Sequence, residues 1–119
     1  FLLKLAAKLY GAKGYGVELD SSIFAEAKQA ISKENLDHMI TVEQKDAFDV
    51  DLSSATVLTL YLSEGGNLKL LPKMKRELSA EARVVSFCWS IPGVKPCRTI
   101  KVDGIPIFLY GSFYDAPQV

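Results

Sequence analysis

Three side chains that could bind a ligand stand where predicted strands end. Glu18 closes the apolar stretch GYGVEL, Asp46 follows the segment ITVEQK, and Tyr61 ends the stretch ATVLTLY. In nucleotide-binding α/β folds, a carboxylate near the end of the second strand accepts hydrogen bonds from both ribose hydroxyls. An ionised carboxylate offers only acceptors, which suits a diol that offers two donors. Glu18 therefore predicts a nucleotide site, and a solvated surface charge remains the alternative.

Asp46 and the aromatic residues extend this prediction. The Asp46 carboxylate can accept from an adenine amino group, while the backbone N–H of Ala47 or Phe48 meets a ring nitrogen; an Asx turn is the alternative. Tyr61 can pack beside a cofactor or substrate, and an aromatic face attracts a sulfonium or ammonium cation. Phe48 and Trp89 follow other strands and could add aromatic walls to such a site. Core packing is the alternative for all three aromatic residues, and for Trp89 it is the favoured interpretation.

The elements that must position these residues alternate along the chain. Helical periodicity predicts helices over residues 1–10, 22–33 and 67–79, and apolar or alternating runs predict strands over 14–19, 40–43, 55–62 and 82–89. Residues 98–113 predict an antiparallel hairpin around Asp103-Gly104. Together they predict an α/β, Rossmann-like, doubly wound and mostly parallel sheet. Ligands of such sheets bind at the carboxyl ends of the strands.

Each of the three predicted helices carries an apolar stripe. In the helix over residues 22–33 it is Ile23, Phe24, Ala27, Ala30 and Ile31. In the first helix, which Gly11 stops, the stripe is Leu2, Leu5, Ala6 and Leu9. In the helix over residues 67–79 the stripe is Leu68, Leu71, Met74 and Leu78. We expect Pro72 to open the main part of this helix at its first turn, after one loose turn.

Further local signals refine the elements. Asp20 or Ser21 is predicted to cap the helix over residues 22–33. The run 55–62 is almost wholly apolar, which predicts a strand buried on both faces, whereas 40–43 alternates as a half-covered strand does. A helix between residues 46 and 55 is predicted to be short or absent.

Composition limits the classes of function. The 119 residues suit a single domain over residues 1–119, and 49% of them are apolar. The 14 basic and 14 acidic residues balance, which gives no support for a nucleic-acid or membrane-surface partner, and no apolar run predicts a transmembrane segment. Two cysteines and one histidine are too few for a zinc site. They favour a reduced intracellular setting, cytoplasmic or mitochondrial, with a Cys88–Cys97 disulfide left open.

With these residues in order, the sequence resembles class I S-adenosylmethionine-dependent methyltransferases. The matching stretches are GYGVELD, KDAFDV, VLTLYLSEGG and KMKRELSAEARVVSF, over about residues 1–110. The proline-bearing loop after the last stretch resembles most the branch with small bacterial methyltransferases and mitochondrial lysine methyltransferases of the ATP synthase c subunit. The resemblance implies S-adenosylmethionine as cofactor and a protein lysine as one candidate acceptor.

The resemblance also implies roles for individual residues. Glu18 would hold the ribose hydroxyls, Leu19 would lie against the adenine, and Asp46 would bind the adenine amino group. Ala47 or Phe48 would supply a backbone N–H, and Tyr61 would lie near the site of methyl transfer. No residue is predicted as a catalytic base, because the sulfonium is already activated and the protein mainly aligns donor and acceptor.

The family pattern demands one more strand and a Gly-rich loop before residue 1. Without that strand, the strands at 14–19 and 55–62 would each lack a backbone partner. We therefore expect a longer natural protein, or a strand borrowed from another chain or oligomer, and poor cofactor binding by the 119 residues alone. Two alternatives stay open: a nicotinamide-dependent dehydrogenase, which shares the carboxylate after the second strand, and a non-catalytic methyltransferase-like interaction domain.

Overall fold

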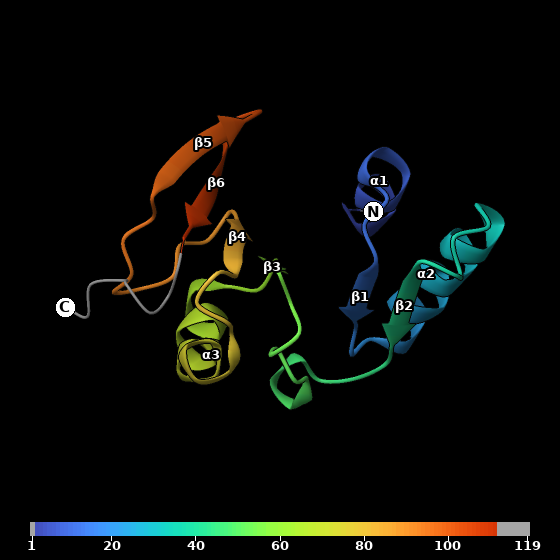
Figure 1. Cartoon of the computed structure of the whole chain (residues 1–119), viewed down its shortest axis with the longest axis horizontal. Coiled ribbons are helices and arrows are strands. Elements are labelled where there is room, and N and C mark those ends of the chain that lie inside the picture. Colours follow the sequence, from blue (N-terminus) through green and yellow to red (C-terminus); the bar gives the residue numbers. More distant parts are fainter. Residues whose placement is uncertain (1, 112–119) are drawn as a thin grey trace. The chain divides into compact units, whose positions relative to one another are not determined.

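The computed structural model describes residues 2–111 and, for Leu5, only the backbone. The predicted helix start at Phe1 and the hairpin end at residues 112–113 lie outside the described residues. The elements in chain order (Figure 1) are α1 (Leu2–Tyr10), β1 (Gly14–Val17), α2 (Ser21–Lys33), β2 (Ile40–Glu43), the 3-10 turn η1 (Ala47–Asp49), β3 (Val57–Leu60), α3 (Glu64–Glu77), β4 (Arg83–Phe87), β5 (Arg98–Val102) and β6 (Ile105–Tyr110). This order confirms the predicted alternation and the absence of a full helix between residues 46 and 55.

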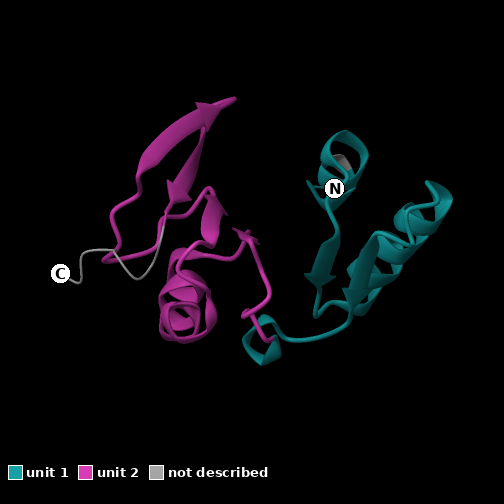
Figure 2. Cartoon of the chain, viewed as in Figure 1, with its two compact units in different colours: residues 1–50 teal, residues 51–119 magenta. Residues whose placement is uncertain are grey.

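The chain divides into two compact units, residues 1–50 and residues 51–119 (Figure 2). The first holds the parallel pair β1-β2, and the second a four-stranded sheet in the order β3-β4-β6-β5. The α/β class, the parallel pairing and the terminal antiparallel strands are as predicted. Within the described residues β1 pairs only with β2, and β3 only with β4, so each has one edge without a strand. The prediction of a single domain stays a prediction.

The core of residues 1–50 forms around one small residue of α1. Ala7 is buried together with Ile31, Leu36 and Ile40. Of the face predicted for α2, Ile31 is buried as expected, whereas the prediction is wrong for Ile23, which is 51% exposed in the first turn of the helix. In α1, Leu3 packs on β1, where a Cβ built at Gly16 would lie 3.0 Å from its Cδ1 atom. Glycine in β1 therefore lets the helix approach the strand at Leu3 more closely than a side chain would permit.

The predicted stripe of α1 is wrong at two of its four positions. Leu2 is 40% exposed and Leu9 is 67% exposed, whereas Leu3 and Ala7 form the face that packs inward. Because apolar residues occur on several faces of this short helix, periodicity alone does not select one. The close approach to the β1 glycines decides the packed face. Gly11, with φ at 65°, ends the helix as predicted.

Ionic contacts join the two helices of residues 1–50. Glu34 follows α2 and accepts from Lys4 Nζ at 2.7 Å and from Lys8 Nζ, both on α1. The hydrogen bond from Lys4, followed by that from Lys8, lowers the pKa of the Glu34 carboxyl from 4.5 to about 2. A lowered pKa means that the folded chain favours the ionised carboxylate.

A Glu34→Gln variant is therefore expected to weaken the attachment of α1. The stabilisation by the carboxylate is fully present above pH 4.5 and is lost as the pH falls toward about 2. Amide exchange in α1 should be faster in the variant than in the wild type at pH 7, and this difference should shrink at pH 3. The exposed Glu26 on α2 offers Glu26→Gln as a matched control. Equal protection of α1 in wild type and Glu34→Gln at pH 7 would contradict the prediction.

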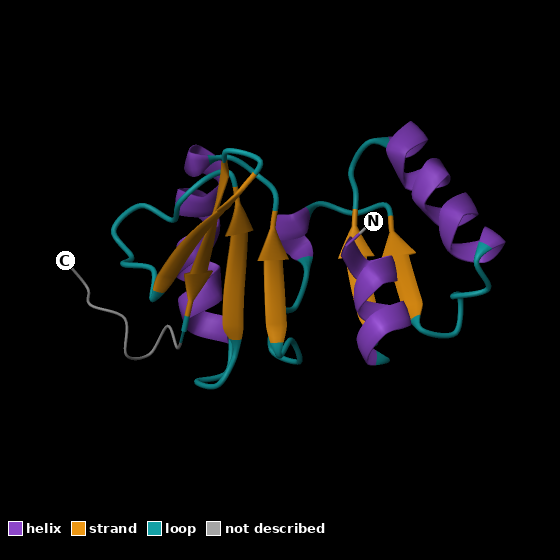
Figure 3. Ribbon diagram, turned by 90° about the horizontal axis from the view of Figure 1, so that it is seen from above, coloured by secondary structure: helices purple, strands orange, loops and turns teal. Residues whose placement is uncertain are grey.

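In residues 51–119 the helix α3 covers one face of the sheet (Figure 3). It begins at Glu64, three residues earlier than predicted, where the Ser63 Oγ accepts from the Gly66 N–H at 2.9 Å. The packed face holds Leu70 and Met74, with Leu78 directly after the helix, all at most 2% exposed.

The prediction for α3 is wrong in two respects. Leu68 was expected in the core but is 52% exposed, and Asn67 is buried instead. Pro72 lies inside the helix rather than at its first turn. A proline there removes the N–H that would bond to the carbonyl of Leu68. Both residues are exposed, so water can take that place.

The strand β3 is less covered than predicted. Leu60 is buried, but Val57 is 43% exposed and Thr59 is exposed as well. The prediction of burial on both faces is therefore wrong for the described residues, where β3 has β4 as its one strand neighbour.

The hairpin of β5 and β6 turns at Asp103 and Gly104, both with positive φ, at 52° and 79°. That pair of conformations suits a two-residue turn whose twist matches the strands, which explains the Asp-Gly sequence. The cysteines are free thiols, so the open disulfide alternative is not adopted. No helix among residues 2–111 is long and apolar enough to cross a membrane.

Candidate functional site

The carboxyl ends of β1 and β2 bring two of the predicted segments together. The strands pair in parallel up to Val17 and Glu43, and the ladder continues past them. The Glu18 N–H donates to the Glu43 carbonyl at 3.1 Å, and the Lys45 N–H donates to the Glu18 carbonyl at 3.3 Å. The backbone at Glu18 is thus held by the last residue of β2 and by the segment that follows it. Because the two strands are parallel, the segments after both of them begin at the same end of the sheet.

The Glu18 side chain is oriented by the turn that follows it. The Asp20 N–H donates to Glu18 Oε2 at 3.1 Å. An ionised carboxylate has about four acceptor positions, so this contact, the one found for the Glu18 side chain among the described residues, leaves most of them for a ligand. Glu18 therefore keeps the acceptor capacity that a diol requires.

Asp20 has the structural role that the sequence predicted. Its carboxylate caps α2 and accepts from the N–H groups of Ser22 at 2.9 Å and Ile23 at 3.1 Å. The hydrogen bonds from the Ile23 N–H, the Ser22 hydroxyl and the Ser22 N–H lower the pKa of Asp20. Asp20 Oδ1 accepts all three of these hydrogen bonds at the helix start, so Asp20 is the cap of α2.

A contact that the sequence did not predict joins the segments that follow β1 and β2. Gln44 Nε2 donates to the Leu19 carbonyl at 3.3 Å, and so links the residue after β2 to the turn after β1. Leu19 itself is 64% exposed, so its side chain is available to a flat apolar ligand. The sequence gives no sign of this hydrogen bond, because the partner of the glutamine is a backbone carbonyl 25 residues away.

Asp46 forms the Asx turn that the sequence left as an alternative. It caps η1, and its Oδ1 accepts from the Phe48 N–H at 3.0 Å. The Phe48 N–H is therefore engaged within the turn, whereas Ala47 begins η1, where a first N–H lacks a partner within the helix. Of the two predicted backbone donors, Ala47 is the one that the geometry leaves for a ligand. Phe48 offers a ring that is 40% exposed.

Tyr61 belongs to residues 51–119 and follows β3. It is 74% exposed, and its ring stacks on Phe87, the last residue of β4, with centroids 6.3 Å apart and planes inclined by 17°. Core packing is thus excluded for Tyr61, and its predicted place near methyl transfer stays a prediction. Core packing was the favoured interpretation for Trp89, and it is wrong, because Trp89 is 43% exposed.

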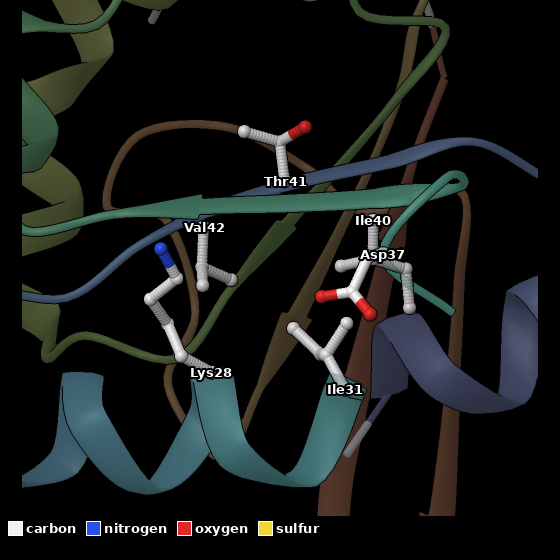
Figure 4. Close-up of a pocket in the computed structure, with 6 residues that line it drawn as sticks. All are labelled: Lys28, Ile31, Asp37, Ile40, Thr41 and Val42. Carbon is white, nitrogen blue, oxygen red and sulfur yellow. The ribbon is translucent and has the colours of Figure 1, made fainter. Parts of the chain in front are cut away.

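A separate hollow of about 180 Å³ lies between α2 and β2. Ile31, Ile40 and Val42 are among its walls, and Lys28 and Asp37 lie at its sides (Figure 4). The Asp37 carboxylate there accepts from the Ser32 hydroxyl at 2.7 Å. None of the predicted site residues lines this hollow, so it is distinct from the candidate site that Glu18 and Asp46 form at the carboxyl ends of β1 and β2. Among the described residues, no group of three or more metal-ligating side chains is found.

Comparisons with known proteins give a consistent family assignment. A family described as "ANTKMT methyltransferase domain" matches residues 1–98. A protein-lysine N-methyltransferase of Saccharolobus islandicus (strain REY15A) is 36% identical over 99 residues, which are 82% of this chain and 62% of that protein. The chain thus spans less than two thirds of the curated relative that it matches.

Solved structures support the same fold. An RNA methyltransferase from Salinibacter ruber, crystallised with S-adenosyl-L-homocysteine, is 30% identical with a TM-score of 0.93; the match covers 99% of this chain and 77% of that one. The B. subtilis tRNA methyltransferase TrmK is 17% identical with a TM-score of 0.76, over 93% of this chain and 55% of that one. The latter likeness concerns the fold alone.

Proposed function

Because the chain belongs to the ANTKMT methyltransferase domain family, we propose that the protein transfers a methyl group from S-adenosylmethionine to an amine of a protein. The observation that carries the proposal is at the carboxyl ends of β1 and β2. Glu18 is held there with free acceptor positions beside the turn formed by Asp46. The family assignment gives no independent support to the dehydrogenase alternative.

The donor and acceptor groups at the carboxyl ends of β1 and β2 fit an adenosine. The Glu18 carboxylate supplies acceptors for the two ribose hydroxyls, and the Asp46 carboxylate has a second oxygen for an exocyclic amino group. The Ala47 N–H can donate to a ring nitrogen, and Leu19 and Phe48 offer exposed apolar surface for the purine. S-adenosylmethionine, when bound, supplies an activated methyl group on a sulfonium.

The residues of the chain would act mainly by binding and alignment. No base is assigned, because alignment of donor and acceptor is the principal requirement of such a transfer. Tyr61 is the residue that we propose to face the transferring methyl group, since an exposed aromatic face attracts sulfonium and ammonium cations.

Calorimetric titration of the full-length protein with S-adenosylhomocysteine tests the cofactor. We expect saturable binding of about one equivalent. A full-length protein that is folded and gives no heat with this ligand would remove the basis of the methyltransferase proposal.

The acceptor requires its own test, because the methyltransferases named above differ in it, with a protein lysine for one and RNA for the others. The protein-lysine relative and the balanced charge of 14 basic and 14 acidic residues favour a protein. With tritiated S-adenosylmethionine and an extract of cells that lack the enzyme, we expect transferred label to be removed by protease and retained after ribonuclease. Label that ribonuclease removes would assign an RNA acceptor instead.

A further inference from the structure

The exit of β4 is held by a buried amide that the proposed chemistry does not use. Asn67 on α3 is fully buried, and its Nδ2 lies 3.1 Å from Ser86 Oγ, 3.3 Å from the Trp89 carbonyl and 3.1 Å from the Ser90 carbonyl. The Ser86 hydroxyl also donates to the Trp89 carbonyl, at 2.6 Å. One side chain of α3 thus fixes two consecutive carbonyls of the segment after β4.

Packing alone does not explain an asparagine at this position. Its Oδ1 is buried without a hydrogen-bond partner among the described residues. A buried polar atom without a partner costs free energy, whereas an apolar side chain of similar volume would carry no such cost. The useful part of Asn67 is therefore its Nδ2, the group that holds the Trp89 and Ser90 carbonyls.

The segment after β4, residues 88–91, is anchored from β6 as well. The Cys88 N–H donates to the Pro106 carbonyl at 2.8 Å, and the Ile91 N–H donates to the buried Tyr110 hydroxyl at 2.8 Å. Cys88 has φ at 73°, a conformation that is uncommon and costly for a residue other than glycine. The surrounding contacts must maintain this bend, which gives the chain a new direction directly before Trp89.

The result is an exposed ring on a fixed backbone. Trp89 is 43% exposed although its carbonyl is held in the interior by Asn67 and Ser86. It follows the carboxyl end of β4, where Ser86 pairs with Leu60 of β3 and the stacked Tyr61 and Phe87 come next. In α/β sheets of this kind the carboxyl ends of the strands are where ligands bind.

We propose that Asn67 is a positioning residue, which fixes the segment 88–91 so that the Trp89 ring binds the methyl acceptor as an ammonium ion, before this ion loses a proton to water and becomes the nucleophilic amine. The inference rests on the proposed function and extends it by naming a contact for the acceptor. An indole face attracts an alkylammonium ion more strongly than other aromatic side chains do. A ring whose backbone is fixed in advance loses less entropy when it binds such an ion.

Trp89 makes the inference measurable without any cofactor, because the resonance of its ring can be identified as the one that Trp89→Phe removes. The full-length protein is labelled with 5-fluorotryptophan, and the Trp89 resonance is assigned with Trp89→Phe. It is then titrated with n-butylammonium chloride as a probe for a lysine side chain, and with 1-butanol and sodium chloride as controls. In the wild type we expect a saturable shift with the ammonium ion alone.

Asn67→Leu removes the amide donor and introduces an apolar side chain of similar size, so the fold should persist. We expect its Trp89 resonance to broaden or move, and the saturable response to n-butylammonium to weaken about tenfold or disappear. Ser86→Ala removes the hydroxyl that donates to the Trp89 carbonyl and accepts from Asn67 Nδ2, but it leaves the contacts of Nδ2 with the Trp89 and Ser90 carbonyls. It should give a smaller change in the same direction. Met74→Leu replaces a residue that is 0% exposed on the same face of α3, and should leave both signals as in the wild type.

Any of three results would overturn the inference. An unchanged Trp89 resonance in both Asn67→Leu and Ser86→Ala would show that the amide does not position the ring. Absence of an ammonium response in the wild type, or an equal response in Asn67→Leu, would remove the acceptor contact. Failure of the proposed function is a different result, namely no binding of S-adenosylhomocysteine by the wild type, and it leaves the cofactor-free Trp89 signals to be judged by themselves.

Discussion

Glu18→Gln should weaken the binding of S-adenosylhomocysteine by the full-length protein about 10- to 100-fold. A hydrogen bond to a charged group contributes about 1.5–3 kcal/mol, and each 1.4 kcal/mol changes a dissociation constant about tenfold. Glutamine replaces one acceptor oxygen with a donor NH₂ group and removes the charge, so a ribose diol loses at least one strong acceptor. Calorimetric titration of both proteins gives the ratio directly.

The remaining contact of Glu18 makes this variant a specific one. A glutamine carbonyl oxygen can still accept from the Asp20 N–H, as Glu18 Oε2 does at 3.1 Å, so the turn before α2 should keep its form. Glu26→Gln removes the same charge from an exposed position on α2 and should bind as the wild type does. If Glu18→Gln and Glu26→Gln bind equally well, Glu18 is a solvated surface charge.

Leu70→Ala should lower the free energy of unfolding by about 2–5 kcal/mol. Leu70 is 2% exposed on the packed face of α3, so truncation removes buried methyl groups and leaves a cavity. Urea denaturation of the wild type and the variant, followed by circular dichroism, measures the difference. The helix itself should tolerate the change, because alanine favours helix at least as well as leucine.

Leu68→Ala is the matched comparison, with the same chemistry two residues away on the same helix. Leu68 is 52% exposed, and its truncation should change the free energy of unfolding by less than about 1 kcal/mol. A larger loss for Leu68→Ala than for Leu70→Ala would restore the stripe predicted from periodicity and contradict the packing of α3 described above.

The features that the sequence predicted best are those decided by neighbouring residues. The Asp20 cap, the stop at Gly11 and the turn at Asp103-Gly104 each depend on one or two side chains and the local backbone. The order of helices and strands was predictable for the same reason, since each element carries its own periodicity. The positions of Glu18 and Asp46 after paired strands followed from that order.

The faces of α1 and α3 were not predictable, because they depend on distant partners. In α1 the face is chosen where Leu3 meets the glycines of β1. In α3 the earlier start at Glu64 and the carbonyls after β4 place Asn67 inside, although an asparagine in a helix is typical of an exposed position. Contacts between a side chain and a remote backbone carbonyl leave no pattern in a single sequence.

The composition of residues 55–62 bears on solubility. These residues combine β-branched, aromatic and leucine side chains with no charge and no proline. When such a segment is unpaired, it is a template for the addition of the same segment from another molecule, as in amyloid. Every unfolded chain exposes this segment, so partly unfolded protein at high concentration is prone to cross-β aggregation through residues 55–62. The denaturation experiments therefore belong at micromolar concentrations with light scattering recorded alongside.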